Sequence, residues 1–491
     1  MQEFFRRNPF FEIAIVAVLV IAAFAIRFHG FKNGGRYTFD EALYVTMAKD
    51  MMYDLNYYNG INYSTMELQH RPNRNLPDYL FKKLFKHPPM YCFLIMFSYS
   101  MHNKFGLSNV PLTHQAVKAS IATGVLTVLV VYLLGRLLFS PMVGLLAAFF
   151  MVIDPVHWIT SQKIWMDTTI TFFMTLSGLF YIYALRKKGG SMLFYILTGL
   201  SIGAAALTKY PGGIVFLSVL LFTALFRMDL LKKPKWLLIP ASMIIMLVQW
   251  FLWNLEVYGL DHFVGKGKGF EDIRAGFAVM GKLLPLIMVA TGIIGVGYFL
   301  WRRFIKNKYD VYLANIPVVL KRKIFWSAVT ILMIAVIVRN DLGYIIRALS
   351  FGFEPATSWK MGFFADEPWY FYFRRLFIYF PIYFFAYIAV FFYPYKEKNE
   401  FLVPVFYFGV IAAFFILWGN YQCRYFLPAI PWLLLFAAFM IVHIHNNIGL
   451  LNNRNMRMTA YVCLWGIVVL CVAKAVQIDI LLAWTNKPCY F

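Results

Sequence analysis

Two adjacent carboxylates follow the first hydrophobic segment of the chain almost at once. Asp40 and Glu41 stand in the stretch Arg36-Tyr-Thr-Phe-Asp-Glu-Ala-Leu-Tyr44, shortly after an apolar block at residues 11–28. A carboxylate at the boundary between water and lipid can act as a general base that takes a proton from an attacking hydroxyl group. Thr38 and Glu41 also have the spacing of a capping box, and acids in the first turn of a helix favour its dipole. The local pattern alone favours this structural role and leaves the catalytic one open.

Basic side chains stand near the ends of several apolar blocks, where a phosphate group could bind. His87 precedes two prolines in Lys86-His-Pro-Pro-Met-Tyr91, a pattern that opens a helix; the alternative is a surface histidine in a turn. Lys209 is a lone lysine between two apolar blocks, either a phosphate ligand or a snorkelling side chain. Arg374 and Arg375 lie just inside another block, where arginine is costly unless it is paired.

A further acid, Asp167, opens an apolar block on the same predicted side of the membrane. Its structural role would be to stabilise the N-terminus of a helix. Its functional role would be to orient a sugar or a cation, and both interpretations stay open.

The composition identifies the elements that must position these residues. Of the 491 residues, 61% are hydrophobic, whereas soluble domains are usually 45–50% apolar. The apolar residues form blocks of the length that spans a bilayer as a helix. The predicted fold is therefore an all-α polytopic membrane protein with about thirteen spans, at residues 11–28, 113–138, 141–158, 167–185, 191–208, 211–227, 236–256, 279–300, 324–340, 370–392, 400–418, 426–444 and 459–483.

The charges of the connecting loops predict the orientation of these spans. With a cytoplasmic N-terminus, the inner loops are consistently rich in Lys and Arg, and most acids fall on the outer side. This pattern holds only if residues 88–105 do not cross the membrane, so we expect an interfacial helix there. The first outer loop, residues 30–111, would then carry interfacial helices beside the acid pair. The outer face is where a reaction or binding site is expected.

The net charge of +23 does not indicate nucleic-acid binding. No basic stretch with interleaved aromatics stands apart from the apolar blocks, and basic loops facing anionic lipid explain the charge. The five cysteines have no metal-ligand spacing. Residues 1–491 are expected to form a single membrane domain, with the first block as a retained anchor and no soluble C-terminal domain.

A series of motifs, in order along the chain, resembles those of the polyprenyl- and dolichyl-phosphate-sugar glycosyltransferases of GT-C fold. That family includes protein O-mannosyltransferases and lipid A aminoarabinose transferases. The resemblance covers residues 36–228 and 366–444, whereas residues 257–365, with two predicted spans and two outer loops, depart from it. Besides the acid pair and the His-Pro-Pro-Met-Tyr stretch, the motifs are Tyr132-Leu-Leu-Gly-Arg-Leu-Leu-Phe139, Lys163-Ile-Trp-Met-Asp167, Leu207-Thr-Lys-Tyr-Pro211, Glu367-Pro-Trp-Tyr-Phe-Tyr372 and Arg424-Tyr-Phe-Leu-Pro428.

The resemblance implies transfer of one sugar from a polyprenyl phosphate to an acceptor hydroxyl, with inversion at the anomeric carbon. It implies Asp40 as the base, with Glu41 either helping or holding the helix start. His87, Lys209, Arg374, Arg375 and Arg424 would bind the donor phosphate. Asp167, Glu367, Trp369 and Tyr370 would orient the sugar or the acceptor. The expected partners are the lipid-linked donor, membrane lipids and a glycan, lipid or protein acceptor.

Other functions and cofactors are less well supported by the sequence. A transporter or flippase of lipid-linked glycans would show repeated halves and acids within spans, but only Glu12 and Asp479 are clear intramembrane acids and no repeat is found. An oligosaccharyltransferase would carry an Asp-x-Asp motif and a Trp-Trp-Asp motif, and both are missing. No cofactor is required; a divalent metal near His87, or near Glu67 and His70, stays an unsupported alternative. The site is expected on the outer side of the cell membrane, or on the lumenal side of the endoplasmic reticulum membrane in a eukaryote.

Overall fold

The computed structural model describes residues 8–30, 39–53, 88–107, 109–186, 191–258, 370–389, 391–393, 399–418 and 422–485. Apart from Tyr258, these residues belong to one compact unit formed by Met1–Val257 and Gly362–Phe491. The predicted spans at 279–300 and 324–340, and nearly all of the divergent region 257–365, lie outside the described residues. Only this unit is considered below.

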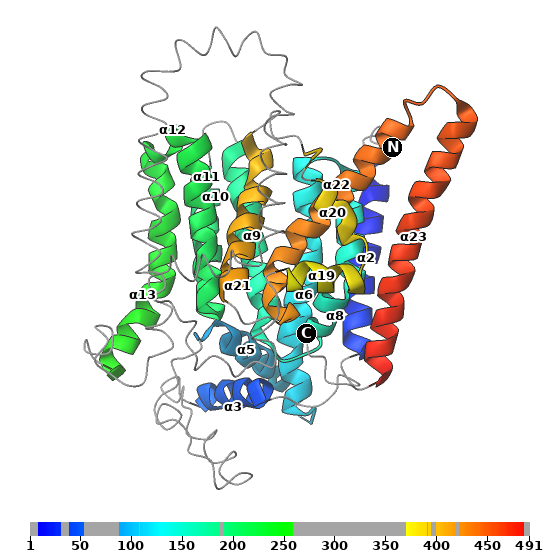
Figure 1. Cartoon of the computed structure of the whole chain (residues 1–491). Helices are drawn as coiled ribbons and strands as arrows, with labels where there is room; N and C mark the ends of the chain where they lie inside the picture. The colour runs from blue at the N-terminus through cyan, green and yellow to red at the C-terminus, as the bar shows by residue number, and fades with distance from the viewer. Residues whose placement is uncertain are drawn as a thin grey trace. The chain divides into compact units, whose positions relative to one another are not determined.

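The described residues fold into helices, and no strand occurs among them (Figure 1). The α-helices are α2 (Pro9–Gly30), α3 (Phe39–Tyr53), α5 (Met90–Lys104), α6 (Leu112–Leu138), α7 (Pro141–Ile153), α8 (Pro155–Ser161), α9 (Met166–Arg186), α10 (Met192–Thr208), α11 (Val215–Phe226), α12 (Met228–Leu231), α13 (Leu238–Tyr258), α19 (Phe371–Tyr379), α20 (Tyr383–Ala389), α21 (Val403–Trp418), α22 (Ile430–Ile448) and α23 (Arg454–Thr485). Four short 3₁₀ segments join them: η4 (Tyr210–Ile214), η5 (Pro234–Leu237), η8 (Asn399–Leu402) and η9 (Cys423–Ala429).

Many of these helices are long and apolar enough to cross a bilayer. Six qualify among the described residues, or seven if α7 and α8 count as one bent span, and three shorter apolar helices accompany them. The chain is therefore an integral membrane protein, as predicted, although the count of thirteen spans is not confirmed. Helix α5 forms where an interfacial helix was predicted and runs across the direction of the long helices (Figure 1). Its place at the membrane surface stays a prediction.

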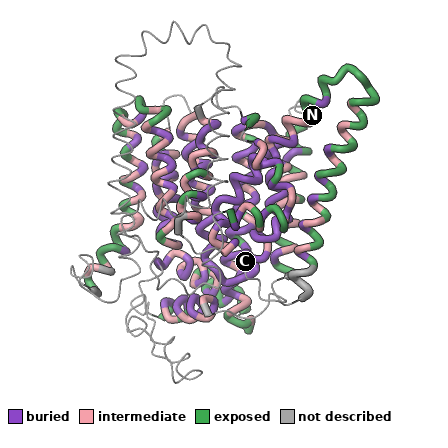
Figure 2. Tube along the Cα trace, viewed as in Figure 1, coloured by how far each residue is buried: buried purple, intermediate pink, exposed green. Residues whose placement is uncertain are grey.

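Buried residues concentrate in the central helices, and Figure 2 shows α13 and α23 with long exposed faces. The exposed side chains of α2, α13 and α23 are mostly apolar, which suits helices that contact lipid. Helices α6 and α7 approach so closely that a Cβ atom on Gly135 would lie 2.6 Å from the Cα atom of Gly144. Glycine permits this contact because it has no side chain, and such pairs let membrane helices pack backbone to backbone.

Two predicted spans are not single straight helices. The block 141–158 bends by 59° between α7 and α8, where the Asp154 carboxylate accepts a hydrogen bond from the His157 amide and Pro155 begins the new helix. The prediction of one continuous span at 370–392 is wrong, because α19 ends before Pro381 and α20 begins only at Tyr383. Proline lacks an amide hydrogen and forces the preceding residue out of the helical region, and Phe380 is indeed extended.

Buried charges tie the first helix to its neighbours. Glu12 accepts hydrogen bonds from the Tyr132 hydroxyl and from Nε of Arg136, at 2.7 Å for the arginine. Arg27 is fully buried and donates to the carbonyls of Ala23, Met151 and Val152 and to Nδ1 of His157. Arg27 therefore fastens α2 to the bend between α7 and α8.

Asp479 of α23 shares this buried environment and interacts electrostatically with Arg27. Its side chain is 1% exposed, and neither carboxylate oxygen has a hydrogen-bond partner among the described residues. Replacing Arg27 with Met is expected to lower the free energy of unfolding by about 3–5 kcal/mol, because its hydrogen bonds to Met151, Val152 and His157 are lost and the buried Asp479 loses a nearby positive charge. Thermal denaturation in detergent measures this loss.

A double variant provides the control for this prediction. Arg27→Met combined with Asp479→Leu should regain part of the lost stability, because it removes one of the two buried acids that interact with Arg27. If the double variant is less stable than Arg27→Met alone, the buried Asp479 does not destabilise the protein in the absence of Arg27, and the prediction is wrong.

Candidate active site

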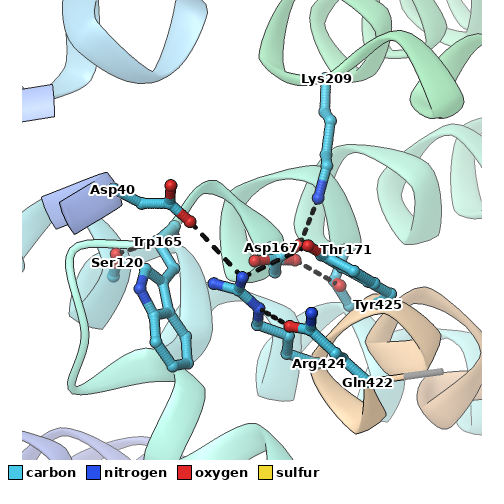
Figure 3. Close-up of polar contacts among 9 residues, drawn as sticks. All are labelled: Asp40, Ser120, Trp165, Asp167, Thr171, Lys209, Gln422, Arg424 and Tyr425. Atoms are coloured by element: carbon cyan, nitrogen blue, oxygen red, sulfur yellow. Dashed lines mark hydrogen bonds and ion pairs between the residues drawn. The ribbon is translucent and has the colours of Figure 1, made fainter. Parts of the chain in front are cut away.

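Four charged residues from distant parts of the sequence meet at the ends of four elements (Figure 3). Asp40 lies in the first turn of α3 and Asp167 in the first turn of α9. Lys209 follows the last residue of α10, and Arg424 is the second residue of η9. Helix α9 packs against both α10 and η9, which brings these ends together. The sequence named all four residues as candidates for the site.

The first ion pair is short and largely buried. Nζ of Lys209 donates to Oδ1 of Asp167 over 2.9 Å, and the two side chains are 15% and 5% exposed. Lys209 is placed by a tight turn in which α10 gives way to η4 at Pro211. A Cβ atom on Gly212 would collide with the carbonyl of Ala205, so only glycine allows this turn to pack so closely.

The second ion pair is longer and more open. Nη2 of Arg424 lies 3.4 Å from Oδ2 of Asp40, and Asp40 is 38% exposed whereas Arg424 is 13% exposed. Of the four charged side chains, Asp40 is therefore the one most accessible from outside. A general base that meets an incoming acceptor needs this accessibility.

Uncharged groups hold the guanidinium of Arg424. Its Nε atom donates to the Gln422 side chain over 2.9 Å, and its Cζ atom lies 4.4 Å from the centre of the Trp165 ring (Figure 3). Such stacking of a cation on an aromatic face is favourable and fixes the guanidinium plane. The sequence analysis missed Gln422 and Trp165, although each is two residues from a charged residue that it named.

The ring of Tyr425 lies beside both cations. Nζ of Lys209 is 4.2 Å and Cζ of Arg424 is 5.0 Å from its centre, and its hydroxyl accepts a hydrogen bond of 3.3 Å from Arg424. The electron-rich ring face offsets part of the repulsion between the two positive charges. Tyr425 was also missed, and it makes the two ion pairs one connected cluster.

Glu41 holds a loop beside this cluster. Its carboxylate is buried and accepts a hydrogen bond of 3.0 Å from the Ile164 amide, immediately before Trp165. The predicted helix start is confirmed because α3 begins at Phe39, and Thr38, the predicted partner of Glu41, lies outside the described residues. Glu41 thus positions the loop between α8 and α9 that carries Trp165.

Aromatic residues line the same region below Asp40. Tyr44 packs edge to face against Tyr91, whose hydroxyl is 2.6 Å from that of Ser120. Burial raises the pKa of the Tyr44 phenol well above its ordinary value, and the nearby Asp40 carboxylate adds to the effect. The hydroxyl of Tyr44 therefore stays protonated and able to donate a hydrogen bond at neutral pH.

The remaining predicted site residues are not shown in contact with the cluster. His87, Glu367 and Trp369 lie outside the described residues. Arg374 and Tyr370 are exposed, and Arg375 stacks on Phe371 with its buried Nε lacking a hydrogen-bond partner in the described part of the chain. Within the residues that the structure describes, no three His, Cys, Asp or Glu side chains are close enough to hold a metal ion.

The arrangement suits a reaction in which an anion leaves and a hydroxyl attacks. Two fixed cations can stabilise negative charge on a leaving phosphate, and a nearby accessible carboxylate can take a proton. The cluster's acids and cations balance, so it can accept an anionic substrate only by exchanging ion partners.

The fold is similar to the GT-C fold of solved membrane glycosyltransferases. The archaeal oligosaccharyltransferase AglB from Archaeoglobus fulgidus, in complex with an inhibitory peptide and a dolichol-phosphate, is similar over 99% of this chain with a TM-score of 0.56 at 14% identity. The same oligosaccharyltransferase tethered to an acceptor peptide matches with a TM-score of 0.55 at 14% identity, over 99% of this chain and 56% of that one. ArnT from Cupriavidus metallidurans in the apo state matches over 96% of this chain and 72% of its own, with a TM-score of 0.50 at 14% identity. This chain spans 57% of the length of the AglB structure.

Residues 84–255 match the family of dolichyl-phosphate-mannose-protein mannosyltransferases. The matched segment contains Asp167 and Lys209, and the resemblance inferred from the sequence motifs is confirmed there. A search of curated protein sequences gave no match.

The contact of Glu41 allows its two predicted roles to be separated. Glu41→Gln is expected to keep turnover within about tenfold of the wild type, because an amide oxygen still accepts the hydrogen bond from Ile164. Glu41→Ala should lose more turnover and about 1–3 kcal/mol of stability, since the buried amide is left unpaired. Turnover and thermal denaturation of both variants measure this difference. If Glu41→Gln is as inactive as Glu41→Ala while both remain folded, the charge of Glu41 takes part in the reaction.

Proposed function

We propose that this protein transfers a single sugar from a polyprenyl phosphate to a hydroxyl group of an acceptor, with inversion at the anomeric carbon. The observation that carries the proposal is the cluster in which Asp40 and Asp167 meet Arg424 and Lys209. The family match over residues 84–255 and the dolichol-phosphate bound to a protein of the same fold support a lipid phosphate as the donor.

In the proposed reaction, the acceptor oxygen attacks the anomeric carbon as the bond from that carbon to the phosphate oxygen breaks. Asp40 takes the proton of the hydroxyl group, and the electron pair of the broken bond stays on the departing polyprenyl phosphate. Attack from the side opposite the phosphate inverts the anomeric centre. A phosphate ester is already a good leaving group, so the site needs positive charge rather than a general acid.

Arg424 and Lys209 supply this charge in the proposal. Arg424 contacts the phosphate, because its forked donors match phosphate oxygens. Lys209 adds positive charge from its position against Asp167. His87, Arg374 and Arg375 stay proposed phosphate ligands, and Asp167, Glu367, Trp369 and Tyr370 stay proposed contacts to the sugar or the acceptor. The proposal needs no metal cofactor.

The reaction is proposed to take place on the outer or lumenal face of the membrane, as the loop charges predict. The acceptor can be a glycan, a lipid or a protein. Lumenal transfer to a protein matches the name of the family most directly, whereas the resemblance to lipid A aminoarabinose transferases favours a glycolipid.

The test is incubation of the purified protein with a panel of polyprenyl-phosphate sugars and candidate acceptors, followed by mass spectrometry. We expect the sugar to leave one donor and to appear on an acceptor with and without EDTA, and Asp40→Asn to be inactive. Uphill or exchange transport of lipid-linked glycans in proteoliposomes without any sugar transfer would favour the alternative of a transporter or flippase. Loss of turnover in EDTA would show that a metal is needed.

A further inference from the structure

The two ion pairs of the active site differ in how firmly they are held. The Lys209–Asp167 pair has a short contact of 2.9 Å between side chains that are at most 15% exposed. The Arg424–Asp40 pair has a single contact of 3.4 Å, and its carboxylate is 38% exposed. Long, partly exposed ion pairs contribute little stability. The pair that contains the proposed base is therefore the one that an incoming anion can open.

Arg424 does not depend on Asp40 for its position. Trp165 stacks on the guanidinium at 4.4 Å, Gln422 binds its Nε atom, and Tyr425 accepts a hydrogen bond from Nη2. Nη1 has no hydrogen-bond partner within the described residues. The guanidinium can thus lose Asp40, keep its place and present both terminal nitrogens to another anion.

A phosphate is the anion that best fits these free donors. Arginine binds phosphate through two parallel hydrogen bonds, and such charge-assisted contacts are stronger than one long contact to a carboxylate. The Asp40 carboxylate competes poorly with a phosphate for Arg424, because the contact between Asp40 and Arg424 is single and long. Once Arg424 has moved to the phosphate, Asp40 is an unpaired carboxylate and a better proton acceptor.

We propose that the phosphate of the lipid donor replaces Asp40 as the ion partner of Arg424, so that donor binding frees Asp40 to act as the base. Trp165, Gln422 and Tyr425 are then positioning residues that hold the guanidinium while it changes partner. The exchange rests on the proposed function and adds an order to it: the donor binds before the acceptor hydroxyl is activated. Without a donor, Asp40 stays neutralised by Arg424.

The exchange predicts that the effect of an Asp40 substitution on donor binding depends on Arg424. This dependence can be measured without knowing the acceptor. The probe is dolichyl phosphate in detergent, with dolichol and inorganic phosphate as separate arms that distinguish lipid and phosphate contributions. Asp40→Asn, although inactive in transfer, is expected to bind dolichyl phosphate about threefold to fivefold more tightly than the wild type, because Arg424 no longer has to leave a carboxylate. In an Arg424→Gln background, the same Asp40 change should alter the affinity less than about twofold.

The matched control is Asp229→Asn, a partly exposed aspartate whose partners are Arg227 and Lys233. Its effect on dolichyl phosphate binding should be the same within about twofold whether Arg424 is present or replaced by Gln. Thermal denaturation of each variant confirms that affinities refer to folded protein.

The outcomes separate the exchange from the proposed function. If Asp40→Asn binds dolichyl phosphate no more tightly than the wild type, Arg424 does not leave Asp40 for the phosphate, and the exchange is wrong. If Asp40→Asn tightens binding equally in both backgrounds, repulsion between Asp40 and the phosphate is the explanation, and the exchange is wrong as well. In either case the glycosyltransferase proposal stands, provided that the wild type prefers dolichyl phosphate to dolichol. If the folded wild type shows no such preference, the proposed function and the exchange both fail.

Discussion

Asp40→Asn is expected to lower the turnover number by about 10²- to 10⁴-fold, the range that a positioned general base contributes. The substitution keeps the size of the side chain and one of its oxygen acceptors, but an amide cannot take the proton of the acceptor hydroxyl. The fold should not suffer, because Asp40 is partly exposed and contacts Arg424 only through one long pair. Turnover is measured by mass spectrometry on the donor that the panel identifies.

Asp229→Asn provides a matched control for this experiment. Asp229 is also partly exposed and paired with an arginine, but it lies in α12, at the end of α11 away from Lys209. Its replacement should leave turnover within about twofold of the wild type, as for most surface substitutions. Turnover of folded Asp40→Asn at the wild-type rate would contradict the assignment of the base.

The sequence predicted the helices well and their interruptions poorly, for a physical reason. Apolar blocks of span length locate α6, α9, α10 and α22 to within a few residues, because burial in lipid requires continuous apolar surface. Hydropathy is an average over a block, however. Pro155 and Pro381 interrupt the helical backbone but hardly change that average, so the interruptions were not predicted. The Asp154-Pro155 pair was a usable sign of a new helix start, because Asp caps helices and Pro favours their first turn.

The active site was predictable as a set of residues and not as a set of contacts. Asp40 and Arg424 could be named because their motifs resemble those of a known family, Lys209 because it is a lone lysine between two apolar blocks, and Asp167 because it opens one. Their pairing could not, since Asp40 and Arg424 are 384 residues apart and lie in α3 and η9, whose approach depends on the packing of the helices between them. Glu41 shows the same limit: its local capping pattern gave no sign of a bond to Ile164 across 123 residues.

The role of Tyr425 can be recognised only when the fold shows which cations lie beside its ring. An arginine next to a tyrosine in sequence, as in Arg424 and Tyr425, is common in membrane proteins and carries little information alone. The ring becomes informative because it also faces Lys209 from another helix end. Two cations beside one ring bring positive charge from two distant elements to one place, which is the physical reason to propose the donor phosphate here.

Arg424→Gln is expected to lower kcat/KM by about 10²- to 10³-fold, the loss typical for a group that stabilises charge developing on a leaving oxygen. Gln cannot supply positive charge to the departing phosphate, and it cannot stack on Trp165 as a cation. The affinity for dolichyl phosphate should also fall, because the forked donors are lost. Arg424→Lys should recover only part of the loss, since an ammonium group keeps the charge but presents no flat fork.

Arg227→Gln is the matched control for Arg424. Arg227 makes two contacts with Asp229, of 3.0 and 3.3 Å, at the far end of α11, so it loses a comparable ion pair without touching the cluster. Its kcat/KM should stay within about twofold of the wild type. If Arg424→Gln resembles this control, the phosphate is held by other cations, and His87, Arg374 and Arg375 become the residues to replace next. If Arg424→Gln fails in kcat but binds dolichyl phosphate normally, Arg424 acts only on the transition state, and its contact with the bound donor would have to form as the bond breaks.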